Sequence, residues 1–444
     1  MGTGVIAALQ PAEWRSCHPR MPPSPRRSGL LLPDLEQPRR RVLPNGAELV
    51  SLPLAGAPLV CLDFWCRAGS LFETANESGI AHFLEHMVFK GSHSLAAGEF
   101  DRRVEALGGS SNAATGFDDV HYHVLIPPEA APEALDLLLD LVLQPRLDGE
   151  AFAMERQVVL EELTQSEDQP EEVALQHLLA IACPGHPYGL PILGRREALL
   201  AHDPAAMAAF HRRLYGGGRC VLALTGALDD GRLEERAAAG ALAALPLLPD
   251  LPQPPPLALK PGEQRLELPR LEAARLLMAW GQPPARDLRG VIGADLATSL
   301  LAEGRRSRLV ERLREQLQIV ESIDLDLHVM ECGSLALLEA VCEPTELPAV
   351  RAAIQAVWQE VMAEPVGPIE WSRVKRLVTN SYCFAMEAAG PVAGLIAPSQ
   401  LWSRHHSLEA PLEAIEAWDP EQLRSEALAS LDPARACLLE AVPA

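Results

Sequence analysis

The stretch His82-Phe83-Leu84-Glu85-His86 places two imidazoles four residues apart, with a carboxylate between them. On an α-helix, residues i and i+4 lie on one face, so His82 and His86 can reach the same ion. Glu85 lies on the same side, where it can take a proton from a metal-bound water. The order H-x-x-E-H inverts the common zinc-protease helix H-E-x-x-H, and the chemistry is the same in either direction. We therefore predict a zinc-binding helix with a general base.

A catalytic zinc needs a third protein ligand and one open position. The segment from Glu155 to Leu163 has helical periodicity and supplies the best candidates. Glu155 and Glu162 are seven residues apart and share one helix face, whereas Glu161 points about 100° away from Glu162. Spacing alone leaves these three glutamates open, and a solvated acidic helix is the ordinary explanation of such a stretch.

The two motifs in this order, His82-x-x-Glu85-His86 and then Glu155-x-x-Val158-x-x-x-Glu162-Leu163, resemble the pitrilysin-type inverzincin peptidases. That family includes insulin-degrading enzyme and the mitochondrial processing peptidase. The resemblance is dense over residues 41–226 and thinner from residue 266 onward. Further matching motifs are Gly91-Ser92, Asn112-Ala113-Ala114-Thr115, His186-Pro187-Tyr188-Gly189 and Phe210-His211-Arg212-Arg213-Leu214-Tyr215.

The resemblance assigns roles to residues that spacing cannot choose between. It implies that Glu162 is the third zinc ligand and that Glu155 supports the catalytic site. It also implies one Zn²⁺ per chain, and a strand at Asn112 and Ala113 that pairs with the substrate backbone.

The second half departs from the family pattern at one position. Arg314 matches a substrate-contacting arginine of the family, but Glu321 stands where a tyrosine is expected seven residues later. A carboxylate donates no hydrogen bond to an oxyanion unless it is protonated. Either Tyr382 or another group replaces the tyrosine, or a partner chain supplies the Arg/Tyr pair.

Composition excludes several classes of function. The 444 residues carry a net charge of −22, which argues against nucleic-acid binding and against anchorage on an anionic membrane. No run of 18 or more apolar residues and no signal-peptide pattern occurs. Nine cysteines without a C-x-x-C pair favour reduced thiols. We expect a cytoplasmic protein.

Mixed strand and helix patterns predict an α+β fold. The family resemblance implies two similar halves, each a mixed sheet with helices, of the LuxS/processing-peptidase-like metalloprotease class. The expected parts are a disordered extension (1–40), an N-terminal zinc-binding peptidase domain (41–244), a Pro-rich linker (245–262) and a C-terminal substrate or structural domain (263–444). The second half lacks H-x-x-E-H and should hold no zinc of this kind.

A rival metal site at His121-Tyr122-His123 has two imidazoles on one face of a strand. No third ligand is apparent from the sequence, and the family resemblance implies that this strand lies near the substrate.

The expected function is a zinc-dependent endopeptidase that cleaves short or unfolded peptides. The alternative is the zinc- and peptide-binding half of a heteromeric peptidase that is little active without a partner subunit. In either case we expect a homodimer, or a heterodimer with a related chain.

Overall fold

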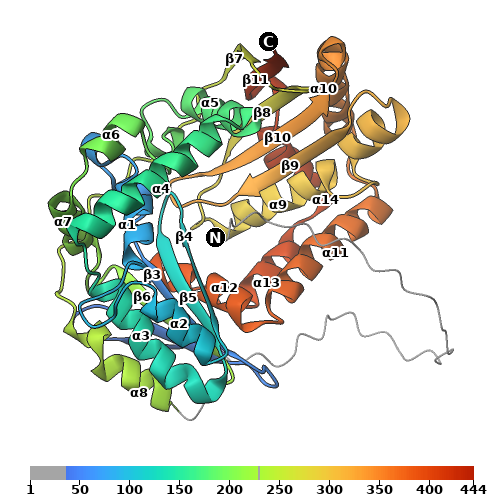
Figure 1. The fold of residues 1–444 in the computed structure, drawn as a ribbon. Helices are drawn as coiled ribbons and strands as arrows, with labels where there is room; N and C mark the ends of the chain where they lie inside the picture. Colours follow the sequence, from blue (N-terminus) through green and yellow to red (C-terminus); the bar gives the residue numbers. More distant parts are fainter. Residues whose placement is uncertain (1–36, 229–230) are drawn as a thin grey trace, which may run out of the picture. The chain divides into compact units, whose positions relative to one another are not determined.

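Two mixed β-sheets, one in each half of the chain, organise the part of the protein that the computed structural model describes, residues 37–228 and 231–444 (Figure 1). The strands of the first sheet are β1 (Arg39–Val42), β2 (Glu48–Pro53), β3 (Val60–Cys66), β4 (Ser110–Thr115), β5 (Val120–Ile126) and β6 (Cys220–Gly226). Those of the second are β7 (Gly262–Leu268), β8 (Ala274–Gln282), β9 (Ser322–His328), β10 (Ser334–Cys342) and β11 (Cys437–Pro443).

Each sheet is mixed because one of its strand pairs is parallel. The first sheet has the order β1-β2-β6-β3-β5-β4, and β2 runs parallel to β6. The second has the order β7-β11-β8-β10-β9, and β7 runs parallel to β11. The remaining pairs are antiparallel. Strand β4 is thus an edge strand, which leaves one side of its backbone open.

Helices flank both sheets. In the first half they are α1 (Ile80–Val88), α2 (Glu99–Ala106), α3 (Ala131–Leu143), α4 (Gly149–Glu167), α5 (Pro170–Ala182), α6 (Arg196–Ala201), α7 (Pro204–Leu214) and α8 (Arg232–Ala239). In the second they are α9 (Leu288–Ala302), α10 (Leu347–Ala363), α11 (Pro368–Ala385), α12 (Ala389–Leu401), α13 (Ala410–Ala417) and α14 (Pro420–Gln422), with π-helical turns at Val310–Gln316 and Leu423–Leu428. The predicted α+β class with two similar halves is confirmed.

Different helices pack against the two faces of the first sheet. Alternate residues such as Phe64 and Tyr122 join a core that includes α1, α3 and α7. On the other face, Cys61 and Val221 pack against Val392 of α12, a helix from the second half. The period of two along each strand sends neighbouring side chains to opposite faces, and thus into these two cores.

The second sheet is covered in a reciprocal way. Leu277 and Leu439 on this sheet share a core with Leu178 of α5, a helix from the first half. Each half therefore supplies one helix to the sheet of the other. The described residues, 37–228 and 231–444, belong to one compact unit for this reason.

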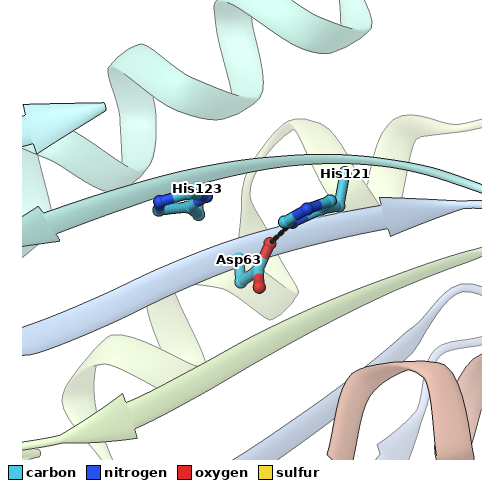
Figure 2. Close-up of side chains that lie close together, drawn as sticks. All are labelled: Asp63, His121 and His123. Atoms are coloured by element: carbon cyan, nitrogen blue, oxygen red, sulfur yellow. Dashed lines mark hydrogen bonds and ion pairs between the residues drawn. The ribbon is translucent and has the colours of Figure 1, made fainter. Parts of the chain in front are cut away.

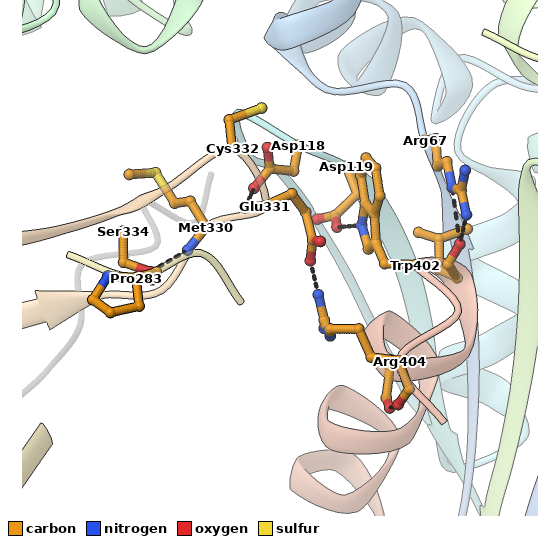
Figure 3. A network of polar contacts seen from close by, with 12 residues as sticks. Arg67, Asp118, Asp119, Pro283, Met330, Glu331, Cys332, Ser334, Trp402 and Arg404 are labelled. Carbon is orange, nitrogen blue, oxygen red and sulfur yellow. Dashed lines mark hydrogen bonds and ion pairs between the residues drawn. The ribbon is translucent and has the colours of Figure 1, made fainter. Parts of the chain in front are cut away.

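Polar contacts also join the halves (Figure 3). Asp118 Oδ2 accepts a hydrogen bond from the Glu331 backbone N–H at 3.0 Å, and Trp402 Nε1 donates to Asp119 Oδ2 at 3.1 Å. Arg404 forms an ion pair with Glu331. These contacts tie the turn between β4 and β5 to the second half.

The expected domain boundaries remain a prediction, but the structure bears on two of them. Residues 248–261 form neither helix nor strand, and Leu257 N–H donates to Cys332 O at 2.7 Å. Strand β1 begins at Arg39, inside the extension expected over 1–40, because it pairs with β2. Residues 1–36 of that extension lie outside the described residues.

Two further expectations concern the cysteines and membranes. The eight cysteines in the described part of the chain are free thiols, and Cys61 and Cys66 lie in cores on opposite faces of β3. No helix within the described residues combines the length and apolarity needed to span a bilayer.

Candidate metal centre

Helix α1 carries both motif histidines and is anchored at its start. Its buried face includes Phe83 and Leu84, which belong to the first core. The carboxylate of Glu73 accepts hydrogen bonds from the backbone N–H groups of Gly79 at 3.0 Å and Ala81 at 2.9 Å. These bonds satisfy donors that every helix start leaves open. The position of α1 is therefore set by both packing and capping.

Helix α4 lies beside α1 and carries the candidate third ligand (Figure 1). Its N-cap, Asp148, accepts hydrogen bonds from the backbone N–H groups of Glu150 and Ala151. Phe152 packs on Phe83 with ring centroids 4.6 Å apart. Because of this contact between the two helices, the glutamates of α4 point toward the histidines of α1.

Three side chains converge between these helices. Glu162 Oε2 lies 3.7 Å from His82 Nε2 and 3.3 Å from His86 Nε2. One ligand atom from each residue lies within 4.8 Å of the other two. A tetrahedral ion with bonds of about 2.0–2.2 Å separates its ligand atoms by about 3.3–3.6 Å. The three residues therefore fit a zinc ion, and they leave a fourth position free.

Glu155 and Lys90 support His86 from the other side of its ring. His86 Nδ1 lies 3.0 Å from Glu155 Oε1, and Lys90 Nζ lies 2.7 Å from Glu155 Oε2. A proton on Nδ1, shared with this carboxylate, leaves the lone pair of Nε2 available for an ion. Glu155 thus fixes both the orientation and the tautomer of His86.

The electrostatics of the cluster suit a cation. Burial, helped by the neighbouring His86, lowers the pKa of His82 to about 4, so this ligand stays neutral. Burial also lowers the pKa of His86, but hydrogen bonds with Glu155 and Glu162 outweigh it and raise this pKa to about 9. The hydrogen bond with His86 lowers the pKa of Glu162. Glu155 and Glu162 therefore stabilise a positive charge at His86. A metal ion can supply this charge in place of a proton.

Glu85 lies on the same helix with a partner from strand β4. Thr115 Oγ1 donates a hydrogen bond to Glu85 Oε2 at 2.5 Å. Burial raises the pKa of Glu85 above its ordinary value, although the Thr115 hydrogen bond opposes this. A carboxylate with a raised pKa is a better proton acceptor near neutral pH. The arrangement can hold a divalent ion and move a proton next to it.

Comparison with known proteins identifies the family of this chain. Residues 54–196 match the family described as Insulinase (Peptidase family M16), and residues 203–378 match its Peptidase M16 inactive domain. Together the two matches span most of the chain. The chain belongs to the insulinase family of peptidases. The match to an inactive domain agrees with the absence of H-x-x-E-H from the second half.

Individual insulinase-family relatives cover the chain to different extents. A zinc protease of Mycobacterium tuberculosis is 27% identical over 394 residues, which are 88% of this chain and 90% of that protein. A mitochondrial-processing peptidase subunit beta of Lentinula edodes is 33% identical over 187 residues, 42% of this chain and 40% of that protein. The crystal structure of a protease from Helicobacter pylori has a TM-score of 0.85 at 22% identity, covering 92% of this chain and all of that one.

The predicted substrate residues lie on the edge strand β4. The backbone N–H of Ala113 donates to Asn112 Oδ1 at 2.9 Å. Asn112 pairs in register with His123, whereas Thr115 pairs with Val120. Paired residues face the same side of a sheet, so the Asn112 side chain points away from α1 while Thr115 points toward it. Contacts of Asn112 with a peptide at the candidate metal centre would therefore come from its backbone.

The predicted residues of the second half lie in other surroundings. Arg314 pairs with the adjacent Glu315, and within the described residues no hydrogen bond or ion pair joins Arg314 to the zinc candidates. Glu321 is exposed and donates its backbone N–H to Val341 at 2.8 Å. Tyr382 packs against the core of the second half, where burial raises the pKa of its hydroxyl. A replacement of the missing tyrosine by Tyr382 stays a prediction.

Sequence reasoning missed two supporting residues and one ligand candidate. Lys90 follows His86 by four residues, so helical spacing could have placed it near Glu155. Thr115 belongs to the Asn112-Ala113-Ala114-Thr115 motif, but no local pattern in the sequence pairs it with Glu85. Asp63 lies on β3, opposite His123 in the sheet, and no sequence signal marks that pairing.

Proposed function

We propose that this insulinase-family protein is a zinc-dependent endopeptidase with one catalytic zinc held by His82, His86 and Glu162. The supporting observation is the convergence of these three ligand atoms beside Glu85. Zinc, when bound, lowers the pKa of a coordinated water from about 15.7 to about 7 and polarises a carbonyl oxygen.

Glu85 is the general base in this proposal. Its carboxylate takes a proton from the attacking water, and its burial-raised pKa suits that task at neutral pH. The protonated carboxyl then passes this proton to the nitrogen of the leaving amine. The Thr115 hydroxyl holds the carboxylate in position through both steps.

The substrate is an extended peptide, because the open edge of β4 ends beside Glu85. A peptide can add to such an edge as a further strand through main-chain hydrogen bonds. Thr115 lies on this strand and also donates a hydrogen bond to Glu85. A peptide added beside the strand would therefore have its scissile bond close to Glu85. Short or unfolded chains satisfy this requirement, whereas folded proteins do not present a free strand.

The substitution Glu85→Gln tests the mechanism. The variant keeps the shape of the side chain but removes the base, so we expect kcat to fall by about 10²–10⁴-fold while zinc content stays at the wild-type level. Fluorogenic peptides and metal analysis give the two readings, and Glu105→Gln, an exposed glutamate on α2, is the matched control. Wild-type turnover in Glu85→Gln would refute the mechanism. Loss of zinc together with turnover would mean that Glu85 is structural.

A second candidate function is motivated by Glu321 and by the ion pair of Arg314 with Glu315. The chain would then be one half of a peptidase whose partner supplies the Arg/Tyr pair, in line with a relative named as a subunit beta. Light scattering and turnover at the same protein concentration test this. Full turnover by a monomer or homodimer excludes the heteromer, whereas zinc binding without turnover supports it.

A further inference from the structure

A second cluster of side chains that could bind a metal lies on strands β3 and β5 of the first sheet (Figure 2). Asp63 on β3 pairs in register with His123 on β5, and Trp65 pairs with His121. The residues between them, Phe64 and Tyr122, face the core that contains α1. Strand alternation therefore places Asp63, His121 and His123 together on the opposite face, the one that α12 covers.

The three side chains are close enough to share an ion. His121 Nδ1 lies 3.0 Å from Asp63 Oδ1, and the rings of His121 and His123 stack with centroids 5.5 Å apart. One ligand atom from each residue lies within 4.8 Å of the other two. To share one tetrahedral ion, these ligand atoms would approach one another to about 3.3–3.6 Å.

The cluster contains one unpaired buried nitrogen and one buried carboxylate. His123 Nδ1 is buried and has no hydrogen-bond partner among the described residues. Asp63 is 3% exposed, and a carboxylate so deeply buried is normally paired or bound to a metal. A hydrogen bond between Asp63 and His121 explains those two residues as a link between strands. It leaves the buried nitrogen of His123 unexplained.

We propose that Asp63, His121 and His123 bind a second divalent transition-metal ion of the Zn²⁺ class. Two imidazoles and one carboxylate are a ligand set that such ions favour. The side chain of His121 is 23% exposed, which gives the ion an entry path. Trp65 stacks on His121 with centroids 4.2 Å apart and packs beside α12, so the ion holds β3 and β5 together beneath that helix.

This site is separate from the catalytic zinc, so its test begins by removing the latter. In a His86→Gln/Glu162→Gln background, titration with Zn²⁺ should show one ion bound per chain, whereas the wild type should bind two. Adding His123→Gln or the near-isosteric Asp63→Asn to this background should weaken the remaining binding by tenfold or more. His93→Gln, which removes an exposed histidine that belongs to neither cluster, should leave that binding unchanged.

Circular dichroism in the presence of a chelator checks that each variant is folded. The absorption spectrum of Co²⁺ bound to the background protein shows which ligand types bind the ion, with the second site unaltered. A Co²⁺ spectrum with nitrogen and oxygen ligands at one ion per chain supports the proposal. Failure of the background protein to bind Zn²⁺ or Co²⁺ overturns it. So does binding that His123→Gln and Asp63→Asn leave intact. If the wild type binds one ion per chain and the background protein binds none, the second site is rejected and the catalytic site is retained.

Discussion

Glu155 and Glu162 are seven residues apart on α4, yet they contact different atoms of His86. Glu162 approaches Nε2, and Glu155 approaches Nδ1. The first can therefore share an ion with His86, and the second can only orient the ring. Lys90 adds a positive charge 2.7 Å from Glu155, which helps keep that carboxylate ionised.

Substituting Glu155 separates these roles. Glu155→Gln weakens the acceptor for His86 Nδ1 and leaves Lys90 without its ion pair, so zinc affinity should fall by about 10–100-fold. Competition with a chromogenic chelator measures this affinity. Glu161→Gln, exposed on the same helix, is the matched control and should not change it. An equal loss in both variants would mean that the charge of α4, not the His86 contact, governs binding.

The candidate site could be predicted from the sequence only in part, and the residues show why. His82, Glu85 and His86 share one helix turn, so local spacing was sufficient. Choosing Glu162 over Glu161 required the family resemblance, because either could face α1 until the packing of α4 is known. Asp63 and His121 are 58 residues apart and meet only through sheet register, which no local pattern encodes.

At the scale of elements, the start of α1 depends on a glycine in the left-handed conformation. Gly79 has φ 83°, and a Cβ at this position would lie 2.6 Å from Leu193 O and 2.8 Å from Gly194 Cα. Gly98 precedes α2 in a similar conformation, with φ 71°, but a Cβ there would meet nothing within 4 Å. The two glycines thus differ in their surroundings and not in their backbone.

This pair of glycines gives a controlled test of how α1 is positioned. Gly98→Ala should cost about 1–2 kcal/mol, the penalty of a left-handed alanine. Gly79→Ala should cost more and should also weaken zinc binding, because relieving the clash with backbone atoms moves α1 and His82. Thermal unfolding and zinc affinity measure both effects. Equal destabilisation by the two substitutions, with unchanged zinc affinity, would contradict this explanation.

Periodicity in the sequence predicts the positions of helices and strands better than it predicts how these elements pack against one another. Apolar residues at helical spacing over 128–143 predict a helix, which the structure shows as α3. The run from Leu59 to Arg67 predicts a strand, which the structure shows as β3. The placement of α12 on the first sheet, and of α5 on the second, was not predicted. Each contact joins apolar faces from different halves of the chain, and an apolar stripe does not specify which sheet it covers.

At the scale of the whole molecule, Asp118 links the halves and carries a perturbed carboxyl. It accepts hydrogen bonds from the Tyr188 hydroxyl and the Glu331 backbone N–H. Burial raises its pKa to about 6, against the opposing effects of the Tyr188 hydrogen bond and the charges of Arg404 and His186. The folded protein therefore holds this proton at pH values where the unfolded chain has lost it.

The sign of the pH effect follows from linkage. Below about pH 4 both states are protonated. As pH rises to about 6 the unfolded chain ionises first, so Asp118 costs the folded state about 2–3 kcal/mol by the end of this range. The difference in melting temperature, wild type minus Asp118→Asn, should therefore fall between pH 4 and 6 and level off above pH 7. Calorimetry in chelator measures it, with the exposed Asp136→Asn as control. A difference that rises with pH would contradict this pKa.

The position of the catalytic ion is the most direct test of the account. Anomalous X-ray diffraction at the zinc edge, on crystals of the zinc-loaded protein, locates the ion itself. We predict a peak bonded to His82 Nε2, His86 Nε2 and a Glu162 oxygen at about 2.0–2.2 Å. Occupied zinc without Glu162 among its ligands, or no zinc between these two histidines, would contradict the central claim.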